Sequence, residues 1–154
     1  MKTVFRIAMI LCVCLLCARV SFAEEPWFSA ERYYQGNPNY VMVQERQEVR
    51  MYVDVSSIVS KIYEPPEYEI SAVVMVVGSQ PGAQRFLTET WHYHYDPQYR
   101  NRQMFVWDEQ RGDWRRVPKF GDADSVTANT VLVRPGGEFV WWKCYQMDFY
   151  YNQK

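Results

Sequence analysis

The sequence contains few cysteines and histidines and has no surplus of basic residues. It has four cysteines and two histidines among 154 residues, and its 17 lysines and arginines are balanced by 18 acidic residues. Binding to the phosphate backbone of nucleic acids requires clustered basic side chains. The one basic cluster, RGDWRR at 111–116, is interrupted by Asp113. The sequence therefore argues against a nucleic-acid-binding function.

The first 23 residues have the pattern of a signal peptide. A basic start precedes the apolar run IAMILCVCLLCA at 7–18, which is too short to span a bilayer as a helix. The small residues Ser21 and Ala23 then predict cleavage that leaves an exported chain beginning at Glu24. We therefore expect a periplasmic, surface-associated or secreted protein that has no integral membrane span once the signal peptide is removed.

Removal of this signal peptide changes the composition of the chain. Lys2, Arg6 and Arg19 leave with it, so that 14 basic residues face 18 acidic ones and the formal charge becomes −4. Three of the four cysteines also leave, so Cys144 has no partner for an internal disulfide. We expect Cys144 to pack in the core as a small apolar side chain. The alternative is a disulfide between two molecules.

The rest of the chain divides into a lead-in segment, 24–44, and a single domain, 45–154. Alternating apolar and polar residues in this part predict strands. The expected strands lie within 40–55, 68–78, 85–96 and 103–118, the first and last of these ranges each holding two strands. The prolines of YEPPEY at 63–68 exclude a central strand there, because proline cannot donate to the ladder. The apolar run at 72–77 predicts a strand in the middle of the sheet.

The C-terminal segment predicts a helix that follows the PGGE stretch. Apolar side chains recur along it at the spacing of one helix face, at Val140, Cys144, Met147 and Tyr151. Glu138 in the first turn would suit the helix dipole. The many aromatic residues leave a strand as the alternative, and we expect 121–134 to be a loop with a short strand or helical turn. The predicted fold class is α+β, with a single antiparallel sheet of about five to six strands and a C-terminal helix packed on it.

The stretch WHYHYD at 91–96 contains both histidines. As a strand it would direct Trp91 and the neighbouring tyrosines to one face and the polar residues to the other. His92, His94 and Asp96 would then share a face, and imidazole and carboxylate are suitable ligands for Zn²⁺. The alternation is equally explained by the solvent face of a strand. We therefore predict no metal and no other cofactor, with these three residues as the candidate ligands should one bind.

The order of the segments resembles that of the surface-adhesin protein E family. The resemblance covers about residues 45–151 and rests on four stretches: MYVDVSSI at 51–58, YEISAVVMVV at 68–77, MFVWDEQRGDW at 104–114, and PGGEFVWW with the terminal FYY. It implies an antiparallel sheet with a packed helix, export to the envelope of a diderm bacterium, and binding to extracellular host proteins. The single remaining cysteine departs from that family, because a disulfide of the family type cannot form.

The sequence predicts a binding function and no catalytic one. Neither a G-x-S-x-G motif nor a Cys-His motif is present to supply a nucleophile. We expect an exported, aromatic-rich envelope protein that acts as a binding module, adhesin-like toward extracellular proteins. One alternative is a periplasmic structural or assembly accessory protein, and another is a small metal-dependent enzyme that uses the His92 and His94 face. A contiguous exposed aromatic patch would favour a partner-binding module.

Overall fold

The computed structural model describes residues 32–46, 48–80, 82–99, 101–119 and 128–150. The predicted signal peptide and residues 24–31 of the lead-in segment lie outside the described residues. So do Tyr151 and residues 121–127 of the predicted loop at 121–134, whereas residues 128–134 of that range are helical.

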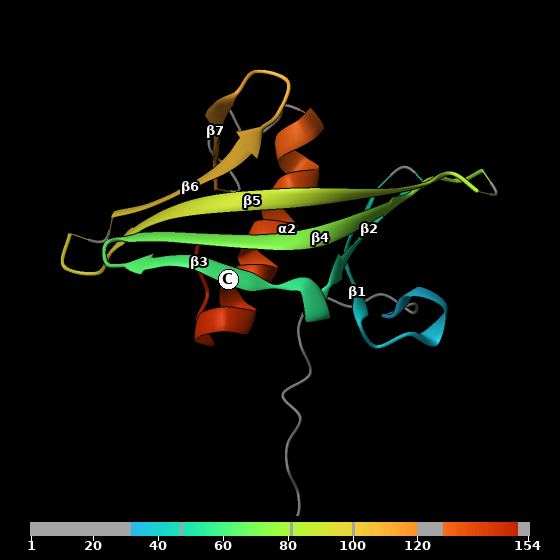
Figure 1. Ribbon diagram of the computed structural model, residues 1–154, viewed down its shortest axis with the longest axis horizontal. Coiled ribbons are helices and arrows are strands. Elements are labelled where there is room, and N and C mark those ends of the chain that lie inside the picture. Colours follow the sequence, from blue (N-terminus) through green and yellow to red (C-terminus); the bar gives the residue numbers. More distant parts are fainter. Residues whose placement is uncertain (1–31, 47, 81, 100, 120–127, 151–154) are drawn as a thin grey trace, which may run out of the picture.

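The described residues form one antiparallel sheet with one helix packed across it, as Figure 1 shows. The seven strands are β1 (Tyr40–Arg46), β2 (Val49–Asp54), β3 (Val59–Glu64), β4 (Glu67–Val77), β5 (Gln84–Asp96), β6 (Asn101–Asp108) and β7 (Asp113–Val117). The helix is α2 (Ala128–Tyr145), and the short 3-10 turns are η1 (Tyr34–Gly36) and η2 (Val55–Ser57). The α+β class is confirmed, with a slightly higher strand count than predicted.

The sheet is built around the long strands β4 and β5. The strand order is β1-β2-β4-β5-β6-β7, and β3 pairs with the half of β4 that β2 leaves free. The turn η2 separates β2 from β3 and leaves the backbone N–H of Val73 in β4 between its two partner strands. That N–H donates to Oγ of Ser57 at 2.8 Å, and Ser57 in turn donates to the carbonyl of Asp54 at 2.7 Å. In the DVSS sequence at 54–57, the Ser57 hydroxyl therefore accepts the hydrogen bond from Val73 that a neighbouring strand would otherwise accept.

The N-terminal part of the sheet contains the two strands expected within 40–55. Strand β1 begins at Tyr40 and pairs with β2 from there onward, so the sheet starts inside the segment 24–44. Tyr52 alternates with the core residues Met51 and Val53 and points to the other face of the sheet, yet it is 1% exposed. It packs with Met42 and Met75 in a small second cluster on the sheet face away from α2. This end of the sheet therefore buries side chains on both faces.

The predicted helix is present but begins earlier than expected. It contains Pro135, Gly136 and Gly137, so Glu138 lies in its interior and not in its first turn. Met147 lies beyond the helix end and is 43% exposed. Local propensity disfavours proline and glycine inside a helix. Tertiary packing overrides this propensity, because glycine lets the helix approach the sheet closely over Trp91.

The predicted apolar face of β5 is confirmed at its centre. Trp91 and Tyr93 are both 0% exposed and lie under α2. The indole N–H of Trp91 donates to the carbonyl of Val133 at 3.3 Å, and the hydroxyl of Tyr93 donates to the carbonyl of Gly137 at 2.7 Å. Leu87, on the same face of β5, is 42% exposed, whereas Val74 opposite it in β4 is 0% exposed. The apolar face of β5 is therefore not buried along its whole length.

We expect Gly137→Ala to destabilise the protein more than Gly136→Ala, its matched control. A Cβ atom at Gly137 would lie 2.6 Å from Sδ of Met104 and 2.8 Å from Cδ1 of Trp91, whereas at Gly136 the nearest atom is 3.1 Å away. Overpacking of a core costs about 1–3 kcal/mol, which can exceed the roughly 1 kcal/mol that alanine gains over glycine in a helix. Urea unfolding measures the difference, and equal midpoints for the two variants would contradict this close approach.

Candidate functional site

The candidate site lies on the sheet face opposite α2, across β4 to β7. We call this surface the open face, because no described helix lies over it (Figure 1). Its side chains follow from the strand period and the register of the ladders. They are Glu67 and Glu69 of β4, His92 and His94 of β5, Gln103, Phe105 and Trp107 of β6, and Trp114 and Arg116 of β7.

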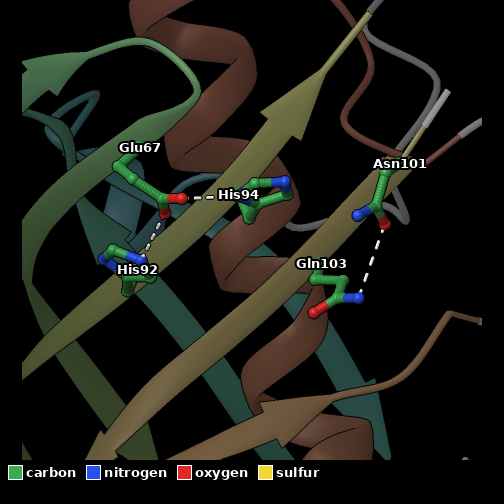
Figure 2. A network of polar contacts seen from close by, with 5 residues as sticks. All are labelled: Glu67, His92, His94, Asn101 and Gln103. Carbon is green, nitrogen blue, oxygen red and sulfur yellow. Dashed lines mark hydrogen bonds and ion pairs between the residues drawn. The ribbon is translucent and has the colours of Figure 1, made fainter. Parts of the chain in front are cut away.

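Both histidines hydrogen bond to one carboxylate on this face. The antiparallel register places Glu67 directly opposite His94. Nε2 of His92 lies 2.8 Å from Oε2 of Glu67, and Nδ1 of His94 lies 2.5 Å from Oε1 (Figure 2). The imidazole side chains are 27% exposed and the Glu67 side chain is 41% exposed. The three groups form a partly exposed network whose geometry is set by two neighbouring strands.

The Glu67 carboxylate is favoured in its ionised form. Burial, the largest single influence, opposes ionisation and would raise the pKa of Glu67, but the hydrogen bonds and the electrostatic attraction of His94 and His92 together outweigh it. The pKa of Glu67 therefore lies below its ordinary value of 4.5. An ionised carboxylate that accepts one N–H at each oxygen holds both imidazole rings in position.

The predicted metal ligands are only partly brought together. Asp96 ends β5 and accepts hydrogen bonds from the backbone N–H groups of Gln98 and Tyr99 at 2.9 and 3.2 Å. The described residues contain no group of three or more His, Cys, Asp or Glu side chains that could hold a metal ion. Glu67 was missed by sequence reasoning. The pairing of β4 with β5 was the signal that could have identified it.

We expect stoichiometric Zn²⁺ near neutral pH to leave the melting temperature of the wild-type protein unchanged. The imidazole nitrogens nearest Glu67 hydrogen bond to different oxygens of its carboxylate, and Asp96 accepts a hydrogen bond from the turn that follows β5. These groups therefore already have hydrogen-bond partners within the protein. A ligand that binds only the native state would raise the melting temperature by mass action. Thermal unfolding with and without the metal measures this. A shift lost in both His92→Ala and His94→Ala would contradict the prediction and support the metal-dependent enzyme.

An aromatic cluster adjoins this network on the open face. The ring centroids of Trp107 and Trp114 are 5.3 Å apart, and that of His92 is 5.4 Å from Trp114 and 6.2 Å from Phe105. These four residues form what we call the aromatic cluster. Trp107 and Trp114 remain 38% and 39% exposed. They flank the predicted β6–β7 turn, but the sequence did not indicate that they would lie beside a histidine.

The other candidate reactive groups lie on the helix side of the sheet. Cys144 packs against the apolar core cluster, as predicted, but it is half-buried and not fully buried. Burial raises the pKa of its thiol, so the environment does not favour a reactive thiolate. Glu89 and Asp108 also lie on this side, and Nη1 of Arg115 is 3.9 Å from Oδ2 of Asp108.

No helix among the described residues is both long and apolar enough to cross a membrane. Comparisons of the chain with protein-family models, with curated proteins and with solved structures find no match. The resemblance to the protein E family therefore stays a prediction.

Proposed function

We propose that this protein is a non-enzymatic binding module that holds its partner on the open face of the sheet. The observation that carries this proposal is the aromatic cluster, in which two neighbouring tryptophans are each more than one-third exposed. Tryptophan is enriched at the energetic centres of protein surfaces that bind partners. The two exposed rings are also in contact, unlike the apolar residues that are scattered singly over most protein surfaces.

The predicted signal peptide supports a partner in the envelope or outside the cell. An adhesin-like protein would bind extracellular proteins, whereas an assembly accessory would bind another envelope component. Both functions use the same surface, so the identity of the partner distinguishes them. The Glu67 network next to the aromatic cluster supplies oriented polar groups, which fix the register of a bound partner more than its affinity.

The test compares capture of partners by the wild-type protein and by a variant with both Trp107→Ala and Trp114→Ala. Each protein, without its predicted signal peptide, is immobilised and exposed to envelope extract and, separately, to purified extracellular matrix proteins. We expect the double variant to lose the captured partner and Tyr99→Ala to retain it, because Tyr99 is 75% exposed but lies outside the aromatic cluster. Thermal unfolding confirms that each variant is folded. Capture that is unchanged in the double variant, or absent from both sources, would contradict the proposal.

A further inference from the structure

We propose that the ligand of the open face is a neutral saccharide. Its sugar rings would lie against the aromatic cluster, and its hydroxyl groups would bind a polar border formed by Glu67, His94 and Gln103. This inference rests on the proposed binding function and names the chemical class of the ligand. It follows from the way in which apolar and polar side chains alternate on neighbouring rungs of the sheet.

The polar border runs across three strands next to the aromatic rings. The register pairs Glu67 with His94, and His94 with Gln103. On the adjacent rung, His92 pairs with Phe105. Nε2 of Gln103 donates to Oδ1 of Asn101 at 3.4 Å, so an amide pair extends the border along β6 (Figure 2). A ligand bound against the cluster would therefore meet polar groups along one of its sides.

The aromatic cluster suits the apolar face of a sugar ring. A pyranose presents C–H groups on its faces and hydroxyl groups around its rim. The negative face of an indole attracts such C–H groups and excludes water from them. Trp107 and Trp114 meet at an interplanar angle of 69° and His92 meets Trp114 at 49°, so the rings offer several orientations instead of one flat wall.

The polar border suits the hydroxyl rim. A hydroxyl group both donates and accepts, whereas an ionised carboxylate has about four lone-pair positions for accepting. His92 takes one lone-pair position on Oε2 of Glu67, and His94 takes one on Oε1. The side chain is 41% exposed, so further hydroxyl donors can reach the remaining positions. The Gln103 amide supplies both a donor and an acceptor beside them.

The charges on this face favour an uncharged ligand. The open face carries the carboxylates Glu67 and Glu69, and Glu64 of the neighbouring strand β3 pairs with Glu67 at its edge. Two cations, Lys61 of β3 and Arg116 of β7, accompany these three acidic residues. Lys61 lies 3.8 Å from Glu69, and Arg116 pairs with Phe105 on the far side of the cluster. A phosphorylated or sulfated ligand would need clustered cations. A wholly apolar partner would bury the polar network without new hydrogen bonds, at a cost in free energy.

The experiment titrates the protein, without its predicted signal peptide, with three neutral probes: cellohexaose, maltohexaose and fully N-acetylated chitohexaose. Isothermal calorimetry gives the affinity, and tryptophan fluorescence reports contact with the cluster. We expect saturable binding of at least one probe, weakened about tenfold or more by Trp114→Ala, as for the central residues of binding surfaces. Gln103→Ala should also weaken it. Trp142→Ala on α2 is the matched control and should bind like the wild type, with thermal unfolding showing that each variant is folded.

The inference is overturned if no probe binds, or if binding of a probe persists unchanged in Trp114→Ala. A protein partner captured through Trp107 and Trp114, or self-association of this chain through them, without saccharide binding would also overturn it. In the case of the protein partner, the proposed binding function would stand and only the ligand class would be wrong.

Discussion

Trp91→Ala is expected to lower the free energy of unfolding by about 3–5 kcal/mol, the range for deleting a large buried aromatic side chain. The indole is 0% exposed and lies between the central strands and α2. Its removal would leave a cavity under Gly136 and Gly137, which have no side chains that could fill it. It would also remove the hydrogen bond from the indole N–H to Val133.

Trp114→Ala is the matched control for this prediction. It is the same substitution, also on the sheet, but Trp114 is 39% exposed and touches other rings only on the open face. We expect it to cost about 1 kcal/mol, within the range of most single substitutions. Urea denaturation measures both losses of unfolding free energy, provided that the slope of free energy against urea concentration is the same in each variant. A larger loss in Trp114→Ala than in Trp91→Ala would mean that the two faces of the sheet are exchanged.

The protein is expected to become less stable as the pH rises from about 5 to about 8. Burial raises the pKa of Glu89 to about 7, although the positive charge of Arg115 opposes this rise. Burial also raises the pKa of Glu138 to about 7, and there Arg134 opposes the rise. A carboxyl whose pKa is higher in the folded protein than in the unfolded chain binds its proton more tightly when folded. Its stabilising contribution is complete below the ordinary value of 4.5 and is lost as the pH rises through about 7. A rise in pKa from 4.5 to about 7 corresponds to about 3 kcal/mol of unfolding free energy for each carboxyl group.

Glu89→Gln isolates one of these contributions. The amide keeps the shape of the side chain but cannot ionise. Arg115 still has a carboxylate partner in the variant, because its Nη1 lies 3.9 Å from Oδ2 of Asp108. We expect the variant to match the wild type near pH 5 and to exceed its stability near pH 8 by up to about 3 kcal/mol. Glu64→Gln, at an exposed position in β3, is the control and should leave the pH dependence unchanged. Urea unfolding at both pH values measures this, and parallel curves for Glu89→Gln and the wild type would contradict the prediction.

Much of the sheet could be predicted because its information is local. The alternation in 40–55 and 85–96, the apolar run of β4 and the turn at Gly112 each depend on residues that are neighbours in the sequence. The helix was placed too late because the positions of Pro135, Gly136 and Gly137 depend on Trp91, which lies more than forty residues away in sequence. Local propensity cannot detect such a contact.

The amino-acid sequence by itself determined the fold class, the central position of β4 and the two faces of β5, because side-chain period and proline positions decide these. Only the tertiary structure decided the candidate site. Glu67 meets His92 and His94, and His92 meets Trp114, through the register of four strands paired side by side. Register depends on how whole strands bury their apolar faces under α2, and that burial is a property of the assembled sheet and not of any segment within it.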